Sequence, residues 1–322
     1  MRAALYRRHG ASSVIEVAEV STPGPGPGEV RVRLSTAGVN PTDWKVRENG
    51  TGLAYDFQIP CHDGGGVIEA VGSGVDPARI GERVWVYLAA HQRQWGTCAE
   101  YTVIPARQAI ALPEGIDFDQ AAGLGVPYLT AHACLFADGP IDGTTILIAG
   151  GAGAVGNAAI QIAVRAGAHV ITTVSSPAKA KIAAAAGAHV IVDYREDDAA
   201  AAIRAAAQAG VDRVIEVALG ANLELDLAVI APHGSIVTYA SEPTDPTIPV
   251  RALMTANVNL RFMLLYGFTP AMLAAGIADV TDGLAEGVYT SLPLTRFDLE
   301  QAAAAQDAVQ ANAVGKVIID LP

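Results

Sequence analysis

The feature that most constrains the fold is an apolar run, Thr145–Ala149, that passes directly into glycines and small residues. Such a run, followed by glycine and then by helix-forming residues, is typical of a buried strand, a tight turn and the start of a helix. The pattern G-x-G-x-x-G is matched by Gly151, Ala152, Gly153, Ala154, Val155 and Gly156. In that pattern the glycines permit the turn, the close approach of a pyrophosphate and tight helix packing. The alternative is a glycine-rich loop without a ligand.

The residues after this turn alternate between helical and strand patterns. We expect a helix to Ala166, strand His169–Val174, helix Lys179–Ala186 and strand Val190–Asp193, then helix Leu223–Ile230, strand Ser235–Tyr239 and strand Asn259–Leu264. Strands that alternate with helices form a parallel sheet. The helix after the glycines would present free N–H groups to a phosphate. We therefore predict a Rossmann domain, a doubly wound parallel sheet that binds a dinucleotide, over residues 125–267.

Residues 1–124 show a different pattern, with short strands separated by turn-forming segments. Val30, Val32 and Leu34 are spaced by two, and Pro23–Gly28 and Gly72–Gly74 are rich in turn residues. This pattern predicts a β-rich, barrel-like domain. Residues 268–322 are too few for a further domain, so we expect them to return and complete the N-terminal one. The predicted fold class is α/β, with two domains.

Composition restricts the partners of this chain. It has 33 acidic and 21 basic residues, a net charge of −12, and no basic cluster long enough to follow a nucleic acid backbone. It also lacks an apolar run of membrane-spanning length and a signal-peptide core. We therefore expect a cytoplasmic protein that binds neither nucleic acid nor membrane. Cys61, Cys98 and Cys134 are widely spaced and odd in number, which favours free thiols.

Five segments, in this order and spacing, resemble the zinc-independent medium-chain dehydrogenases/reductases, and among them the quinone oxidoreductases of the zeta-crystallin type. They are Gly38–Arg47, Gly64–Val75, Gly125–Ala131, Gly150–Gly156 and Gly315–Ile318. The resemblance extends over nearly the whole chain. It implies a GroES-like β-rich catalytic domain, a Rossmann domain, NADPH as cofactor and the two-electron reduction of quinones or related enones.

The end of the predicted strand His169–Val174 bears on the choice of cofactor. In NAD-binding Rossmann domains an Asp or Glu at this point holds the ribose 2′-hydroxyl. This chain has Ser175, Ser176 and Lys179 instead, which suit the 2′-phosphate of NADPH, and Tyr194 matches a family position beside that phosphate. The alternatives are Ser176 as a helix cap and Lys179 as a surface residue.

The resemblance implies further cofactor contacts near the nicotinamide, mostly through the backbone. It places there Thr130, Asn222, Tyr239, Ala240, Met263 and Leu264. It also places Lys316 near the cofactor from the other domain.

Zinc-using relatives bind their catalytic metal through Cys, His and Cys. His62 and Asp63 match the His-Glu pair of those relatives, but Asn40 and Val126 fall at the positions of the two cysteines. Catalytic zinc sites have about three protein ligands, and one good ligand remains here. We therefore predict no metal, and we expect His62 to be a pocket-wall or hydrogen-bonding residue.

A quinone is a strong electrophile, so its reduction requires alignment with the nicotinamide and hydrogen-bond donors to the oxygen that gains charge. Asn40 and Tyr55 are the candidate catalytic donors. Asn40 as a turn residue before Pro41, and Tyr55 as a packing residue, are the alternatives.

The leading hypothesis is an NADPH:quinone oxidoreductase. An enone or enoyl-thioester reductase shares the fold and cofactor, and an NADPH-binding protein with a structural or regulatory role is a hypothesis of a different class. We also expect a homodimer, because the apolar segment Phe262–Tyr266 lies at the predicted edge of the sheet, where it would otherwise promote aggregation.

Overall fold

The computed structural model describes residues 1–195, 198–242 and 244–322. The chain forms two compact units. The first unit contains residues 1–126, 280–287 and 293–322, and the second contains residues 127–279 and 288–292. The predicted domain boundaries, 1–124 with 268–322 and 125–267, stay a prediction. Within the described ranges, no helix is both long and apolar enough to cross a membrane.

The second unit is built on a six-stranded parallel sheet, in the order β10-β9-β8-β11-β12-β13. Its strands are β8 (Thr145–Ile148), β9 (His169–Val174), β10 (Val190–Asp193), β11 (Val211–Glu216), β12 (Ile230–Thr238) and β13 (Asn259–Phe262). Counted from β8, this order is 3-2-1-4-5-6, which is that of a Rossmann sheet. The prediction of a doubly wound parallel sheet is therefore confirmed.

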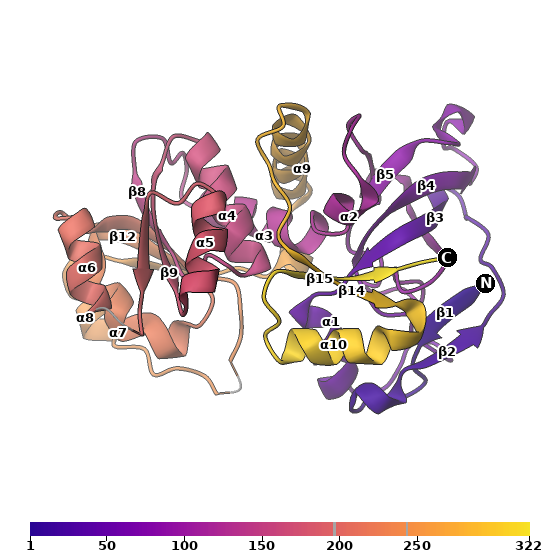
Figure 1. Cartoon of the computed structure of the whole chain (residues 1–322), viewed down its shortest axis with the longest axis horizontal. Helices are drawn as coiled ribbons and strands as arrows, with labels where there is room; N and C mark the ends of the chain where they lie inside the picture. Colours follow the sequence, from indigo (N-terminus) through magenta and orange to yellow (C-terminus); the bar gives the residue numbers. More distant parts are fainter. Residues whose placement is uncertain (196–197, 243) are drawn as a thin grey trace. The chain divides into compact units, whose positions relative to one another are not determined.

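Helices cover both faces of this sheet. They are α3 (Gly125–Leu135), α4 (Ala154–Arg165), α5 (Pro177–Ala185), α6 (Ala199–Ala206), α7 (Leu219–Val229) and α8 (Val250–Ala256). Figure 1 shows α4 and α5 on one side of the strands and α6, α7 and α8 on the other. Ile146, Leu147 and Ile148 of β8 are at most 1% exposed, because a parallel strand between two helical layers is buried on both faces.

Helix α7 begins at Leu219, four residues before the predicted start at Leu223. Tertiary contacts stabilise this first turn. The carboxylate of Glu216, at the end of β11, accepts hydrogen bonds from the Ala218 N–H and the Asn222 amide, and Glu242 accepts one from the Gly220 N–H. Free N–H groups at a helix start need such acceptors. Because both carboxylates lie outside the helix, its periodicity does not indicate where it begins.

Strand β12 begins at Ile230, five residues before the predicted start at Ser235. Its pairing with β11 shifts between Val211 and Arg213. Such an irregularity accommodates the Pro232 of β12 inside a sheet, where proline cannot donate to the ladder. Pro232 and Gly234 therefore lie at an irregularity within β12, and not in a loop that precedes the strand.

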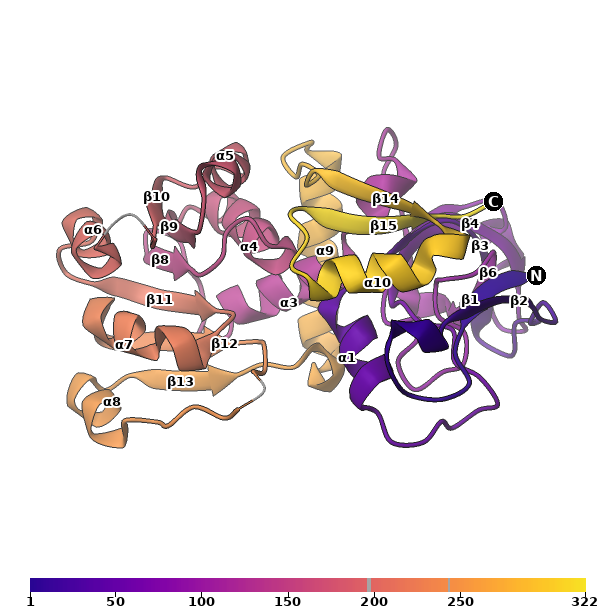
Figure 2. The same cartoon turned by 60° about the horizontal axis from the view of Figure 1, so that its bottom comes forward.

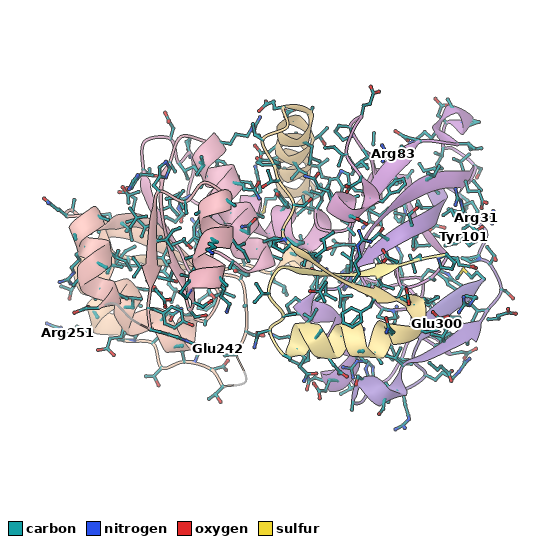
Figure 3. The ribbon with its side chains drawn as sticks, in the orientation of Figure 1. Arg31, Arg83, Tyr101, Glu242, Arg251 and Glu300 are labelled. Carbon is teal, nitrogen blue, oxygen red and sulfur yellow. The ribbon has the colours of Figure 1, made fainter. Side chains whose placement is uncertain are left out.

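The first unit is built on a largely antiparallel sheet in the order β14-β15-β3-β4-β5-β7, with β6 also paired to β3. The strands are β3 (Glu29–Gly38), β4 (Asp63–Val71), β5 (Arg83–Val86), β6 (Tyr101–Pro105), β7 (Ala109–Ala111), β14 (Leu294–Asp298) and β15 (Lys316–Asp320), and β1 (Arg2–Leu5) and β2 (Glu16–Glu19) form a separate pair. Figure 3 shows Arg31 of β3 beside Tyr101 of β6, where the guanidinium lies 5.5 Å from the ring centroid.

The C-terminal residues complete this first sheet. Strand β15 pairs antiparallel with β3, with Ile318 opposite Gly38, and parallel with β14. The helices of the unit are α1 (Pro41–Asn49), α2 (Phe118–Ala121) and α10 (Ala302–Gln310), and α9 (Pro270–Ala285) contributes residues to both units. Figure 2 shows α10 running alongside β14 and β15. Strands β3 and β15, which are far apart in the sequence, are thus neighbours in one sheet.

Two buried carboxyl groups lie close together, Glu216 at the end of β11 and Asp226 on α7. Glu216 is fully buried and Asp226 is 1% exposed, and the two side chains lie close enough to interact electrostatically. Two carboxylates cannot both ionise at such short range without strong repulsion, so the pair holds a proton. Burial, with the neighbouring Glu216, raises the pKa of Asp226 to about 8.

This pair predicts a pH-dependent stability. Asp226 keeps its proton in the folded chain up to about pH 8, whereas in the unfolded chain it loses it near pH 4. Because the folded state then binds the proton more tightly, the free energy of unfolding should fall as pH rises from about 4 to about 8. In Asp226→Asn the amide can donate to Glu216 without titrating, so the fall should be smaller.

Urea denaturation between pH 5 and pH 8.5 measures this difference. Glu224→Gln, a charge-matched change on the exposed face of α7, is the control and should retain the wild-type profile. Parallel profiles for Asp226→Asn and the wild type would mean that Asp226 is already ionised in the folded state.

Candidate functional site

The glycine-rich turn after β8 has the geometry expected of a phosphate-binding turn. Gly150 adopts φ +70°, a conformation that side chains rarely adopt. A Cβ atom added at Gly151 would collide with Thr172 of β9, and one added at Gly156 would collide with the Gly150 carbonyl. At Gly153 an added Cβ would lie 3.4 Å from that carbonyl, an ordinary contact. Packing thus requires glycine at Gly151 and Gly156, and Gly153 leaves room for a ligand.

The end of β9 carries the polar groups predicted to meet a 2′-phosphate. The Lys179 ammonium donates to Ser175 Oγ at 2.9 Å, and Ser176 Oγ accepts from the Lys179 N–H at 3.3 Å. Ser176 is therefore the N-cap of α5, which was one of the alternatives, and it stands beside the lysine as well. Tyr194 follows β10 and is 51% exposed. The hydroxyl and ammonium groups fit a phosphate dianion, and the ribose-binding carboxylate is missing.

The other predicted cofactor residues of the second unit follow the carboxyl ends of parallel strands, apart from Thr130. Asn222 lies in α7 after β11, Tyr239 and Ala240 follow β12, and Met263 and Leu264 follow β13. In parallel sheets these ends meet at one edge, where ligands bind. Thr130 lies in α3 and is 5% exposed. The roles of these residues stay predictions.

Lys316, the first residue of β15, belongs to a buried polar cluster in the first unit. The cluster consists of Asn40, Asp43, His62, Asp63 and Lys316, each at most 5% exposed. The Lys316 ammonium donates to Asn40 Oδ1 at 2.8 Å and to the Val39 carbonyl at 3.1 Å. Burial lowers the pKa of Lys316, while Asp63 and Asp43 raise it. Two carboxyl groups thus face one ammonium.

Asn40 connects the two charges of this cluster. Its Nδ2 donates to Asp63 Oδ2 at 2.7 Å, while its Oδ1 accepts from Lys316. Asp63 also accepts from the Val126 N–H at 2.9 Å. The partners on either side therefore fix the orientation of the amide. Burial raises the pKa of Asp63 to about 6, against the lowering effects of Lys316, Asn40 and Val126.

Asp43, another member of the cluster, stabilises the start of α1. Its carboxylate accepts from the Asn40 N–H at 2.7 Å, and Pro41 occupies the first helical turn, where its missing N–H costs nothing. Burial is the main reason that the pKa of Asp43 rises to about 7. His62 Nε2 lies 3.9 Å from Asp43 Oδ1, but burial lowers the pKa of His62 to about 3. His62 is therefore neutral, and the two do not form an ion pair.

The residues at this cluster do not fit a zinc site. Zinc needs lone pairs that converge on one point. Asn40 directs its oxygen to an ammonium, and Val126 offers an N–H that already donates to Asp63. Asp43, His62 and Asp63 are then the remaining donors, next to a buried cation. Among the residues that the structure describes, no three His, Cys, Asp or Glu side chains are grouped to hold a metal.

Tyr55 lies apart from this cluster, in the segment between α1 and β4. It is 42% exposed, and its hydroxyl donates to the Gln92 carbonyl at 3.3 Å. The hydroxyl is thus accessible but not fixed by packing. The structure brings Asn40 and Lys316 into contact, and it leaves the role of Tyr55 a prediction.

Two residues with structural roles here, Asp43 and Glu216, were not predicted from the sequence. For Asp43 the signal was the spacing Asn40-Pro41-x-Asp43, because an acidic residue three positions after an N-cap returns to the cap N–H. For Glu216 the signal was a carboxylate at the end of an apolar strand, Val214-Ile215-Glu216. A charge in that place must have partners, and the partners lie on α7.

Each of the two units matches a known protein family. Residues 26–114 match the alcohol dehydrogenase GroES-like domain, and residues 154–280 match the zinc-binding dehydrogenase family. A quinone oxidoreductase of Pseudomonas aeruginosa is 31% identical over 98% of this chain and 98% of its own. The structure of mycobacterial Rv1454c complexed with NADPH is 29% identical, with a TM-score of 0.87 over 99% of this chain and 100% of the other. A structure titled NAD-dependent alcohol dehydrogenase is 27% identical, with a TM-score of 0.90 over the whole of both chains.

The charge balance of the polar cluster predicts the effect of removing its cation. Lys316→Met leaves Asp63, Asp43 and the Asn40 oxygen buried without their ammonium. Loss of one partner of a buried pair costs about 3–5 kcal/mol, so the free energy of unfolding should fall by that order. Adding Asp63→Asn to Lys316→Met should recover part of the loss, because it removes one of the unbalanced charges.

Urea denaturation at pH 7.5 measures both effects. Lys181→Met, on the exposed face of α5, is the matched control and should change stability little. A loss for Lys316→Met no larger than for Lys181→Met, or no recovery in the double variant, would contradict the assigned pairing.

Proposed function

Because the chain belongs to the zinc-independent medium-chain dehydrogenases/reductases of the quinone oxidoreductase type, we propose that it reduces quinones with hydride from NADPH. The chain is an oxidoreductase, and the finer assignment concerns its cofactor and acceptor. The observation that carries the assignment is the pair of Ser175 and Lys179 at the end of β9, in place of a ribose-binding carboxylate. The acceptor class rests on the family.

In this proposal the turn after β8 holds the cofactor pyrophosphate through the backbone N–H groups of residues 151–156. Ser175, Ser176 and Lys179 hold the 2′-phosphate, with Tyr194 beside it. The ammonium of Lys179 already lies 2.9 Å from Ser175 Oγ, so little reorganisation is needed to bring both groups to one anion. Thr130, Asn222, Tyr239, Ala240, Met263, Leu264 and Lys316 remain the proposed contacts near the nicotinamide.

Bound NADPH supplies a hydride, and the chain supplies position and hydrogen bonds. A primary amide carries two N–H groups. Asp63 accepts one from Asn40, and we assign the other to the quinone oxygen that gains charge. The Lys316 ammonium on the opposite end of the amide polarises it toward donation. Tyr55 is the second proposed donor.

We also propose a homodimer formed through the β13 edge of the six-stranded sheet. In the part of the chain that the structure describes, β13 pairs with β12 alone. Phe262 is 67% exposed and Leu264 is 64% exposed, and Val250 and Met254 of α8 are 61% and 70% exposed. An unpaired strand edge flanked by large apolar side chains is suited to pair with its own copy.

The cofactor assignment predicts a selective loss on replacement of Lys179. A hydrogen bond to a charged group contributes about 1.5–3 kcal/mol. Lys179→Ala should therefore weaken NADPH binding roughly 10- to 100-fold and leave NADH binding nearly unchanged. Lys181→Ala, on the same helix, is the control. Calorimetric titration measures the affinity of each variant for both cofactors. Equal losses of affinity for NADPH and NADH in Lys179→Ala would refute the role of Lys179 at the 2′-phosphate.

The two proposed donors predict modest losses of turnover. Removing one donor to developing charge costs about 10²–10³ in kcat at a demanding site, and less for a reactive acceptor. Asn40→Ala and Tyr55→Phe should each lower kcat with NADPH and a quinone by about 10-fold. Tyr101→Phe, which keeps its ring beside Arg31, should retain wild-type turnover. Unchanged turnover in both donor variants would exclude them, and faster turnover with an enone would favour the reductase alternative.

The edge-strand proposal predicts the oligomeric state. Multi-angle light scattering at micromolar concentration should give twice the chain mass for the wild type. Phe262→Lys should shift the mass toward one chain, because the charge would be buried at the paired edge. Ile80→Lys, at a site 53% exposed in the first unit, is the control. A wild type with the mass of one chain would rule the dimer out.

A further inference from the structure

Two of the three cysteines lie in direct contact in the first unit. The Sγ atoms of Cys61 and Cys98 are 2.8 Å apart, and both residues are fully buried. Both are free thiols in the structure. A disulfide bond is about 2.05 Å long, so the two sulfur atoms need to approach by only about 0.8 Å to form one.

The backbones on both sides of this pair are already held together. The Cys98 N–H donates to the Pro60 carbonyl at 3.2 Å, and the Thr97 N–H donates to the Cys61 carbonyl at 3.0 Å. Disulfide formation commonly fails because the backbone must move to bring the side chains together. Here the hydrogen bonds already hold the two backbone segments next to each other.

Cys61, which contacts Cys98, has an unusual backbone conformation. Its φ is +73°, a left-handed value that non-glycine residues rarely adopt. The Thr97 N–H donates to the Cys61 carbonyl, and this bond helps to hold the strained residue in place. Strain of this kind persists where the surrounding structure enforces it, and often where it has a use.

We propose that Cys61 and Cys98 form a reversible intramolecular disulfide with hydrogen peroxide as oxidant. In the first step one thiolate attacks peroxide, giving a sulfenic acid and hydroxide. In the second step the other thiol displaces water from the sulfenic acid, forming the S–S bond. In total, two thiols and one peroxide yield one disulfide and two waters. A dithiol reductant reverses the change.

Burial sets the rate of this reaction. It raises the pKa of the Cys61 thiol well above its usual value, so the reactive thiolate is scarce and oxidation is slow. Cys134, in the second unit, is equally buried, and burial raises its pKa to about 12. Cys134 therefore matches the pair in burial and differs from it in having no second thiol at hand, since the chain has three cysteines.

The disulfide would restrain the segment that carries part of the polar cluster. Cys61 directly precedes His62 and Asp63 in the chain. A bond to Cys98 would fix this segment to the neighbouring one. The proposal rests on the thiols alone, so its test does not depend on whether the chain reduces quinones.

The test counts thiols in the full-length protein. The reduced, folded protein is incubated with hydrogen peroxide, unfolded, alkylated with N-ethylmaleimide and weighed by intact mass spectrometry. We expect the number of alkyl groups to fall from three to one. Digestion should then yield a cross-linked peptide that joins Cys61 to Cys98. Dithiothreitol before alkylation should restore three alkyl groups.

Cys98→Ser is the matched variant, with one thiol of the pair removed and the size nearly kept. It should form no internal cross-link under the same treatment. Three alkyl groups on the peroxide-treated wild type would overturn the proposal. So would oxidation of Cys61 to sulfinic acid without a cross-link, or a cross-link that involves Cys134.

Discussion

The proposed site of the first unit depends on the interaction of the buried Lys316 ammonium with Asn40 and with the nearby carboxyl groups of Asp43 and Asp63. The ammonium donates to the Asn40 oxygen, Asn40 donates to Asp63, and Asp63 accepts from the Val126 N–H. The ammonium balances charge that burial would otherwise make costly. It also fixes the Asn40 amide with its N–H groups away from the lysine. The chain supplies this cation from β15, the last strand of the chain.

In the second unit, the proposed cofactor residues are positioned by a different constraint. The carboxyl ends of the parallel strands form one common edge of the sheet. The turn after β8, the serine and lysine after β9 and the asparagine after β11 lie at that edge because strand order places them there. Two carboxylates stabilise the start of α7, and thereby the position of Asn222. Burial and the neighbouring Glu216 raise the pKa of Asp226 on this helix, and this links the stability of the unit to pH.

Much of this architecture follows from local pattern. The alternation of strand and helix after Thr145 predicted the Rossmann sheet, because parallel strands buried on both faces are continuously apolar. Contacts between distant segments could not be predicted in this way. Lys316 and Asn40 are far apart in sequence, and no periodicity indicates that β15 pairs with β3. The early start of α7 depends on Glu216 and Glu242, which lie outside the helix. The adjacency of Cys61 and Cys98 likewise depends on backbone hydrogen bonds between two irregular segments.

The proposed reaction is the reduction of quinones with NADPH, with the buried Lys316 as the cation of the site and without a metal. The most direct measurement is NADPH oxidation at 340 nm with a simple quinone, before and after exhaustive treatment of the protein with EDTA. Metal analysis of the treated protein checks that the metal has been removed. The account predicts undiminished, stoichiometric NADPH consumption by the metal-stripped enzyme, and no oxidation of a simple secondary alcohol with NADP⁺. Loss of quinone reduction on chelation, followed by its recovery when zinc is added, would contradict it, since His62 and Asp63 would then be metal ligands.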